Sequence, residues 1–336
     1  MNEQQLCAAI ANIIDGYANK RYSLNDVAHV ERWIKQFEEG ERQIVLEETL
    51  HILQNHYITK EMFETFSEQI IDNQALTGGN PQAFWANASI LDIQINGHSQ
   101  QELNGIFCNI LAQKYNINNI VNVESNTYFY VDDFIFSGNR MYSDIEHWVN
   151  EQEPSDCKIY LVTLGYYLSG KYTLSKKLNA LFKGKGITYE FYRYPHLELE
   201  NRFKYRDRSE RFWPTANVAN EQTIRNYITQ KNLTFTYRVP VQHTNKVFSN
   251  QRREQYEQIM LKYGVRIVGF PQNNNMYVKP LGYDTWPSLG FGSAVFTFRN
   301  CPNNNPLPFW WGDPHAPEGN ALKRWYPLLQ RTVYRD

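Results

Sequence analysis

Residues 128–140, Tyr-Phe-Tyr-Val-Asp-Asp-Phe-Ile-Phe-Ser-Gly-Asn-Arg, place an apolar, aromatic run directly before two carboxylates. Asp132 and Asp133 are followed by a short loop that contains Ser137 and Gly138, and then by a segment with helical character. This order predicts a strand, an acid pair, a small-residue loop and a helix. Such a unit can bind a sugar phosphate, because carboxylates accept hydrogen bonds from ribose hydroxyls and N–H groups at a helix start face a phosphate.

The central part of the chain alternates apolar runs with single helix-like segments. We predict strands over residues 90–95, 128–131, 158–164, 187–192, 265–270 and 290–298, and helices over residues 102–115, 140–150, 174–183 and 251–262. Strands that alternate with single helices are typical of βαβ units, so the expected fold is α/β with a mainly parallel sheet. The loops 96–101 and 132–140 both follow strands, and they are therefore expected at one edge of that sheet.

The first 78 residues differ from the rest of the chain. Apolar side chains recur there at helical spacing, and Thr77-Gly-Gly-Asn-Pro81 is a clear linker signal. Residues 1–80 carry 6 Lys/Arg against 13 Asp/Glu, so the other 28 Lys/Arg and 22 Asp/Glu lie in residues 81–336. We expect a helical N-terminal region over residues 1–78 and a second domain over residues 79–336, with a basic, irregular insertion at about 196–256.

Three features bear on the cellular setting of the chain. No apolar run reaches the ~18 residues that a membrane-spanning helix needs. The N-terminus lacks the basic and apolar segments of a signal peptide. The four cysteines show no metal-ligand spacing and are expected to be reduced thiols. Together these features predict a cytoplasmic protein that has no membrane contact.

Tyr130-Val-Asp-Asp133, taken alone, matches the Tyr-x-Asp-Asp metal motif of reverse transcriptases. In that motif two carboxylates hold catalytic Mg²⁺ beside a third. Here only about 40 residues separate the pair from Asp92, the best upstream candidate for the third. A Ser-Gly-Asn loop also follows the pair, where a hairpin would need a strand. The polymerase interpretation is therefore the less favoured alternative.

The same segment resembles the diphosphoribosyl-binding loop of type I phosphoribosyltransferases. In that family an apolar strand, Asp-Asp, two apolar residues and a hydroxyl-Gly loop open a helix, as Val131-Asp-Asp-Phe-Ile-Phe-Ser-Gly138 does here. The family then has a hydroxyl residue or Gly where this chain has Asn139 and Arg140. Losing the second glycine restricts backbone approach to a 5′-phosphate, and Arg140 can compensate as a phosphate ligand.

Two further segments narrow the resemblance to phosphoribosyltransferase-like effector domains of bacterial anti-phage conflict systems, some of which accompany retron reverse transcriptases. One is the turn at 96–101, Asn-Gly-His-Ser-Gln-Gln, where these domains have their diphosphate-side loop. The other is the C-terminal block 299–310, which is similar to their Asn-x-Pro-Asn-Asn-Thr-x-Pro-x-x-Trp signature, with Asn305 in place of the Thr. The resemblance covers roughly residues 80–312.

The resemblance implies a type I phosphoribosyltransferase-like topology and a set of site residues. Asp132 and Asp133 are the catalytic pair, which would bind the ribose 2′- and 3′-hydroxyls and would touch Mg²⁺ indirectly, through the ligand. Two loops would hold the phosphates. The 5′-phosphate loop comprises Ser137, Gly138, Asn139 and Arg140, and the diphosphate-side loop comprises Gly97, His98 and Ser99. Asn303, Asn304 and Trp310 belong to the C-terminal signature, as substrate or structural residues.

The implied function is that of an anti-phage defence effector, a glycosyltransferase that binds phosphoribosyl diphosphate or a nucleotide. It would transfer or cleave the ribosyl group with Mg²⁺. The alternative is a non-catalytic sensor or assembly subunit that binds a nucleotide or nucleic acid within a defence complex. A reverse transcriptase with its nucleic acid is one implied protein partner, and a homo-oligomer is left open.

Each motif also has a plainer interpretation. Paired Asp residues after a strand can cap a turn or helix, and His98 can be a polar turn residue. Asn303 and Asn304 can form only an Asx turn, and Trp310 only core. The alternating cations Arg202, Lys204, Arg206 and Arg208 are predicted on one face of a strand. They would contact nucleic acid or a partner, or else form a solvated edge.

Overall fold

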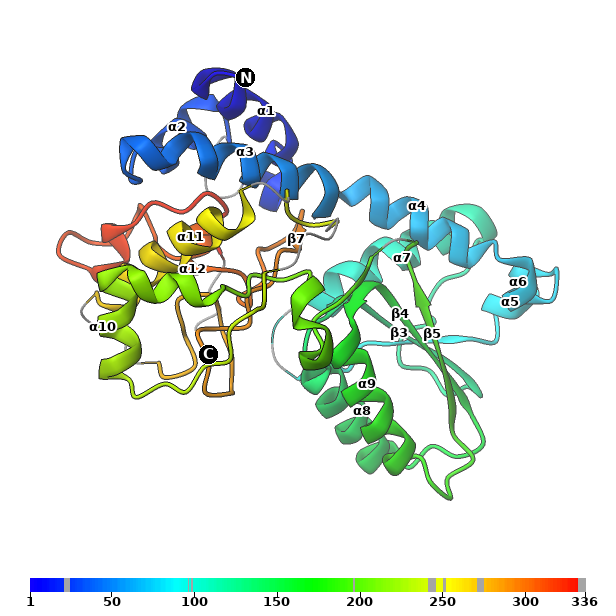
Figure 1. Ribbon diagram of the computed structural model, residues 1–336. Coiled ribbons are helices and arrows are strands. Elements are labelled where there is room, and N and C mark those ends of the chain that lie inside the picture. Colours follow the sequence, from blue (N-terminus) through cyan, green and yellow to red (C-terminus); the bar gives the residue numbers. More distant parts are fainter. Residues whose placement is uncertain are drawn as a thin grey trace. The chain divides into compact units, whose positions relative to one another are not determined.

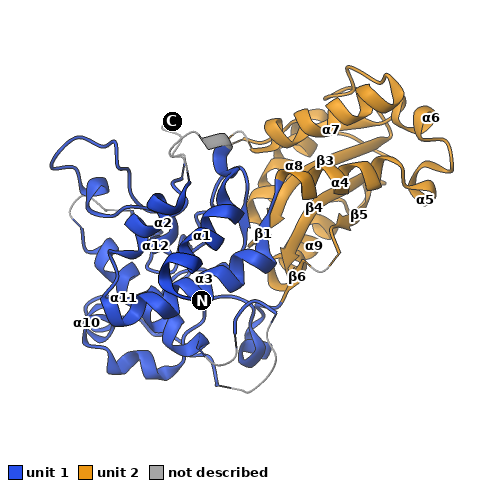
Figure 2. Cartoon of the chain, turned by 90° about the horizontal axis from the view of Figure 1, so that it is seen from above, with its two compact units in different colours: residues 1–59, 200–336 blue, residues 60–199 orange. Residues whose placement is uncertain are grey.

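The computed structural model (Figure 1) describes residues 1–20, 25–95, 97, 99–195, 197–240, 246–249, 252–270 and 275–331. The chain divides into two compact units (Figure 2). Residues 60–199 form one unit, and residues 1–59 together with 200–336 form the other. The domain boundary that the sequence places between residues 78 and 79 stays a prediction. The two units are described one at a time below.

A parallel sheet forms the centre of the 60–199 unit. Its strands are β2 (Ser89–Leu91), β3 (Thr127–Ile135), β4 (Lys158–Tyr167) and β5 (Thr188–Arg193), hydrogen-bonded in that order, with β6 (Glu198–Leu199) paired to the end of β4. Ile90 also bridges Val121 in parallel on the other side of β2. The segment around Val121 therefore adds a short edge, and β2 lies between it and β3.

Helices cover both faces of this sheet, which explains why its strands read as continuous apolar runs. Side chains alternate along β3, so Tyr128 packs toward Trp148 of α8 while Phe129 packs toward Trp85 at the end of α6, with ring centroids 4.9 and 4.4 Å apart. The helices are α4 (Lys60–Ile71), α5 (Gln74–Thr77), α6 (Pro81–Trp85), α7 (Ser99–Tyr115), α8 (Asn139–Gln152) and α9 (Leu168–Leu181). In Figure 1, α8 and α9 lie side by side.

The helices that follow β2 and β3 leave the sheet in opposite directions. Phe107 of α7 packs on Trp85, on the Phe129 face, whereas Ile145 and Trp148 of α8 belong to the core on the Tyr128 face. The loops after β2 and β3 therefore diverge at the carboxyl ends of the two strands. In doubly wound α/β sheets this switch point is where ligands bind.

The other unit is mostly helical, with a two-stranded parallel sheet. Its helices are α1 (Glu3–Ile14), η1 (Tyr17–Lys20), α2 (Val27–Ile34), α3 (Glu39–His56), η2 (Phe203–Arg208), η3 (Ala216–Asn220), α10 (Gln222–Gln230), α11 (Arg253–Val268), α12 (Leu307–Trp310) and η4 (Ala321–Arg324), and its strands β1 (Tyr57–Ile58) and β7 (Phe296–Thr297). The α/β class, the parallel sheet and the helical N-terminal region are confirmed.

Besides β3 and β4, which run past their predicted ends, three of the predicted strands have the wrong extent or type. Residues 265–268 continue α11, because Met260, Tyr263 and Ile267 are buried at helical spacing. The strand predicted over 290–298 shrinks to Phe296–Thr297, since Gly290 and Gly292 adopt φ of 124° and 74°, outside the extended region. The strand predicted over 90–95 ends at Leu91.

Candidate functional site at the carboxyl end of β3

Asp132 and Asp133 lie inside β3 and not after it. The strand continues to Ile135 because β4 runs beside it as far as Tyr167, and Asp132 is in register with Thr163 of β4. The two acidic residues are 2% and 7% exposed. A strand end at residue 131 was therefore a wrong prediction, and the carboxylates are more deeply buried than a loop position would make them.

Arg140 neutralises this buried pair. Its Nη2 donates to both carboxylate oxygens of Asp132, at 3.0 and 2.8 Å, and lies 3.8 Å from Oδ1 of Asp133. Burial raises the pKa of Asp132 above its ordinary value, and the Arg140 charge opposes that rise. The Asp132 charge in turn raises the pKa of Arg140, whose side chain is 47% exposed. A solvent-accessible cation thus covers the acid pair.

The loop between β3 and α8 is fixed by close backbone packing. Gly138 has φ of 76°, and a Cβ there would lie 2.7 Å from the carbonyl oxygen of Gly170 and 2.9 Å from Cβ of Leu174. A Cβ on Gly170 would in turn overlap the carbonyl of Phe136. Gly138 is also the N-cap residue of α8 and makes no side-chain cap hydrogen bond. The first N–H groups of α8 therefore start from a tight loop whose N-cap residue has no side chain to cover them.

Asn139, at the start of α8, is held by a residue that the sequence analysis missed. Its Oδ1 accepts a hydrogen bond of 2.9 Å from Nζ of Lys177 on α9. The same Nζ lies 4.7 Å from the ring centroid of Tyr142. The loop thus has two nearby cations, Arg140 on its own helix and Lys177 on the next. The N–H of Asn139 also points to Oγ of Ser137, at 3.4 Å.

The loop after β2 is tied to β3 and α8 by buried polar side chains. Gln100 accepts hydrogen bonds from the N–H groups of Ile93 and Gln94 at 2.7 and 2.9 Å. Asp144 of α8 accepts from the N–H of Ile95 at 3.1 Å and from the Tyr130 hydroxyl at 2.8 Å. Neither Gln100 nor Asp144 was singled out in the sequence, because their roles depend on the tertiary structure.

The predicted diphosphate-side residues lie in this loop. Gly97 has φ of 94°, in the left-handed region that glycine accepts without strain. Ser99 is 5% exposed, and its Oγ donates to Oε1 of Gln94 at 3.0 Å. His98 lies outside the described residues. Contact of Gly97, His98 and Ser99 with a diphosphate stays a prediction.

Three buried polar atoms in this unit lack a hydrogen-bond partner within the described part of the chain. One is Oδ1 of Asn104 on α7. The other two bear on the site. They are Oγ1 of Thr163, which is in register with Asp132, and Nε2 of Gln100. Buried polar atoms are nearly always paired, so each unpaired one calls for a partner from outside the chain or from water. Both belong to the elements that surround the switch point.

The C-terminal signature residues lie in the other unit and organise its backbone. Asn304 donates from Nδ2 to the carbonyl of Tyr283 at 3.0 Å, and the Asn303 carbonyl accepts from the N–H of Tyr283 at 2.7 Å. Trp310 donates from Nε1 to the carbonyl of the fully buried Asn305 at 2.7 Å. These contacts give the signature residues a role in packing and turn structure, and contact with a substrate stays a prediction.

The cations at 202–208 do not form one face of a strand. Residues 203–208 form the 3₁₀ helix η2, in which Arg202, Lys204 and Arg208 lie 4.6, 5.3 and 5.4 Å from the ring centroid of Tyr205. Arg206 lies 5.1 Å from that of Phe203. The predicted strand is wrong because cation–ring contacts gather these side chains around the aromatics in a turn-like segment.

Comparison with known proteins decides the family. A family model named PRTase-CE, where PRTase denotes phosphoribosyltransferase, matches residues 30–331. This chain belongs to the PRTase-CE family. The match spans β2 to β5 and both loops described above, and it confirms the predicted PRTase-like resemblance. Membership in PRTase-CE supports a phosphoribosyl-related transferase role.

Two other comparisons add less. Among solved structures, the chain is similar to the Helicobacter pylori xanthine-guanine-hypoxanthine phosphoribosyltransferase, at 15% identity and a TM-score of 0.26, over 43% of this chain and 89% of that one. No curated protein matches the sequence. Within the described residues of this PRTase-CE chain, none of the helices has the length and apolar character needed to span a membrane.

Proposed function

We propose that this PRTase-CE chain binds a phosphoribosyl compound, phosphoribosyl diphosphate or a nucleotide, at the carboxyl end of β3. The observation that carries the proposal is the juxtaposition of a buried carboxylate pair with a helix start, one short loop later, whose N-cap residue is Gly138 and whose first N–H has only a long, 3.4 Å contact with Oγ of Ser137. Asp132 and Asp133 offer acceptors for the ribose 2′- and 3′-hydroxyls. The loop from Ser137 to Arg140 offers N–H groups and a cation for the 5′-phosphate.

Arg140 links the two halves of this site. In the structure its guanidinium occupies both oxygens of Asp132, so a ribose hydroxyl must compete with it there. A 5′-phosphate gives Arg140 an alternative bidentate acceptor, because phosphate and carboxylate match the same guanidinium geometry. Ligand binding would therefore transfer Arg140 from Asp132 to the phosphate and release the carboxylate for the ribose. This exchange favours phosphorylated sugars over free ribose.

Mg²⁺ fits the same arrangement. Proteins commonly hold Mg²⁺ through one or two carboxylates together with substrate phosphates. Asp132 and Asp133 would face the ion through the bound ligand, and the ion would supply charge neutralisation for a departing diphosphate. The chain's own contribution is positioning of the ribose and stabilisation of the phosphate charges. With Mg²⁺ the ribosyl group would be transferred to an acceptor or cleaved.

The wider role we propose, an anti-phage defence effector, rests on the family resemblance of the three sequence segments. A reverse transcriptase with its nucleic acid is the partner that this resemblance suggests. A second candidate is a non-catalytic sensor or assembly subunit that binds a nucleotide or nucleic acid. Two features favour this alternative. Asn139 and Arg140 stand where the type I pattern has a hydroxyl residue or glycine. Arg140 also forms an ion pair with Asp132, which occupies that carboxylate.

Phosphorus NMR of the full chain with phosphoribosyl diphosphate and Mg²⁺ distinguishes the two roles. With water as the only acceptor present, an enzyme that cleaves the ribosyl group releases diphosphate, and the Asp132→Asn/Asp133→Asn variant does not. Glu124→Gln/Glu151→Gln is the matched control, since it neutralises two exposed carboxylates of the same unit. Ligand resonances that broaden on binding without release would exclude cleavage with water as the acceptor and would favour the sensor over a cleaving enzyme. Unperturbed resonances with folded protein would rule out a site for phosphoribosyl diphosphate in either role.

A further inference from the structure

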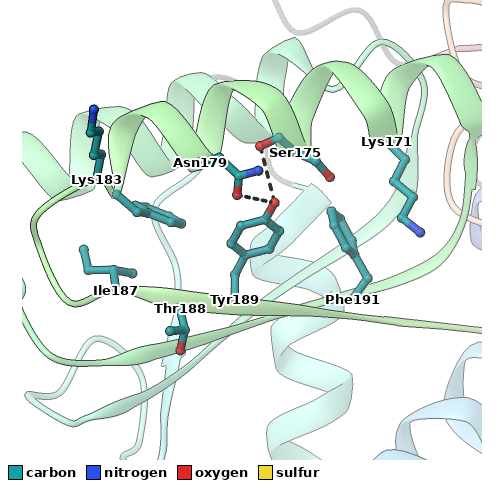
Figure 3. Close-up of a pocket in the computed structure, with 9 residues that line it drawn as sticks. Lys171, Ser175, Asn179, Lys183, Ile187, Thr188, Tyr189 and Phe191 are labelled. Atoms are coloured by element: carbon teal, nitrogen blue, oxygen red, sulfur yellow. Dashed lines mark hydrogen bonds between the residues drawn. The ribbon is translucent and has the colours of Figure 1, made fainter.

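A groove runs between α9 and β5 (Figure 3). Its volume is about 590 Å³, within the ~300–1,000 Å³ of small-ligand sites. Phe182, Ile187, Tyr189 and Phe191 form the apolar part of its lining. In Figure 3, Tyr189 and Phe191 rise from β5 toward α9, with a lysine at each end of the groove.

The aromatic side chains of the groove form a continuous row. Phe182 and Tyr189 have ring centroids 5.9 Å apart, Tyr189 and Phe191 5.7 Å, and Phe191 and Tyr166 6.3 Å. The Tyr189 hydroxyl donates to Oδ1 of Asn179 at 2.9 Å, which fixes the ring beneath α9. Tyr189 and Phe191 are half-buried against the core, so the row is rigid and still reachable from the groove.

The chain around the groove is rich in positive charge, of which Lys158 is paired with Glu190 of β5 at 2.8 Å. Residues 157–189 contain six lysines and no Asp or Glu. Lys171 stands at one end of the groove, with Nζ 5.4 Å from the ring centroid of Phe191 and 4.7 Å from that of Tyr166. Lys183 stands at the other end and is exposed. Among the described residues, neither lysine forms an ion pair with a carboxylate.

We propose that this groove binds a single-stranded nucleic acid. Sequence-tolerant single-strand sites combine a cationic track for the phosphates with aromatic rings on which bases stack, and the groove has both. Bases would stack on Tyr189 and Phe191, and phosphates would pair with Lys171 and Lys183. An acidic peptide would pair its carboxylates with the lysines, but its side chains would not need a row of aromatic rings. The proposal is independent of the phosphoribosyl site and of the cations at 202–208.

The test uses the full chain and a fluorescein-labelled oligo(dT) of about 20 nucleotides, long enough to cover a single-strand site. Anisotropy titrations at about 50 and 200 mM salt give the affinity and its salt dependence. Three variants are compared with wild type. They are Phe191→Leu, which keeps apolar volume but removes the ring; Lys171→Gln/Lys183→Gln; and the control Lys35→Gln/Lys60→Gln, which removes two exposed lysines elsewhere.

The proposal predicts that Phe191→Leu weakens binding about tenfold, the effect of losing one stacked base. Lys171→Gln/Lys183→Gln should lower the slope of log affinity against log salt by about 1.4, since each single-strand phosphate contact contributes about 0.7. The control should stay within about twofold of wild type. Absent binding, equal effects in groove and control variants, or an unchanged affinity in Phe191→Leu would overturn the proposal. Preferential binding of an oligoglutamate probe would assign the groove to an acidic protein partner and would also overturn it.

Discussion

Arg140 of α8 forms an ion pair with Asp132 of β3, in which the single nitrogen Nη2 donates to both carboxylate oxygens, at 3.0 and 2.8 Å. The pair joins the last strand residues before the loop to the first turn of the helix after it. One partner is buried and the other is half-exposed. The carboxylate is therefore fixed by the fold, whereas the guanidinium is the partner that can move.

Removing Arg140 should make stability depend on pH. In Arg140→Gln the buried Asp132 loses its cation, so its pKa rises further above the ordinary value. A carboxyl whose folded pKa is raised costs stability only when it is ionised, so the cost appears as pH rises above the pKa of the unfolded chain. Because solvent screens the half-exposed guanidinium, we expect the free energy of unfolding of Arg140→Gln to fall by only about 1–2 kcal/mol at pH 8. Urea unfolding at pH 8 and pH 5 measures it, and an equal loss at both pH values would contradict the assignment.

Gly138 can be tested against a glycine of the same conformation. Gly138→Ala incurs the left-handed backbone cost and also the close approach to Gly170 and Leu174. Gly184 has φ of 78° with nothing within 4 Å of its Cβ position, so Gly184→Ala incurs the backbone cost alone. We expect the free energy of unfolding to fall by about 1 kcal/mol in Gly184→Ala and by at least about 3 kcal/mol in Gly138→Ala. Equal losses in urea unfolding would show that the loop does not pack on α9 as described.

The parts of this site that could be predicted are those whose residues are close together in the sequence. The acid pair, the Ser-Gly loop and the following helix are contiguous, so residues 128–140 were sufficient to propose the chemistry. Lys177 contacts Asn139 from 38 residues away, and Asp144 contacts Ile95 from 49 residues away. Their roles come from the packing of α8 against α9 and against the loop after β2, which no local pattern signals.

The fold shows the same limit at the ends of its elements. The strand–helix alternation was readable because each central strand is buried on both faces. The end of β3 could not be predicted from the sequence, because adjacent aspartates are typical of loops. Asp132 and Asp133 stay within the strand only because β4 runs beside them and Arg140 pairs with Asp132. The apolar segment at 265–270 is too short to distinguish strand from helix by its composition. Only its continuity with α11 decides that its first four residues are helical.

The unit formed by residues 1–59 and 200–336 contains a buried charge cluster. Glu257 accepts from Arg238 at 2.7 Å, from Arg253 at 3.0 Å and from the N–H of Trp213 at 3.0 Å. All three charged side chains are buried, so Glu257→Gln leaves two guanidiniums without their anion. We expect a loss of about 3–5 kcal/mol in the free energy of unfolding.

Glu31→Gln provides the comparison for Glu257→Gln, because Glu31 belongs to a surface pair with Lys35. A surface pair of this kind contributes under about 1 kcal/mol. Urea denaturation of both variants gives the two losses. Similar losses in the two variants would mean that the Glu257 cluster is open to water in solution.

His56 should make the same unit sensitive to acid. Burial lowers the pKa of His56 from its ordinary value of 6.5 to about 4. A histidine with a depressed folded pKa stabilises the fold above its unfolded pKa, and that contribution is lost as pH falls from 6.5 toward 4. Between pH 7.5 and 5 wild type should therefore lose about 2 kcal/mol more than His56→Gln, which does not titrate. Parallel stability–pH curves for the two proteins would contradict the burial of His56.

Asp132 and Asp133 form the phosphoribosyl site that we propose, and calorimetric titration with phosphoribosyl diphosphate measures binding there. Wild type, Asp132→Asn/Asp133→Asn and the control Glu124→Gln/Glu151→Gln would be titrated with and without Mg²⁺, after circular dichroism shows that all three are folded. We predict Mg²⁺-dependent binding by wild type and control, with affinity at least about tenfold weaker in the aspartate variant, the loss of about one charged hydrogen bond. Binding of equal affinity in all three proteins, or none in folded wild type, would contradict the account.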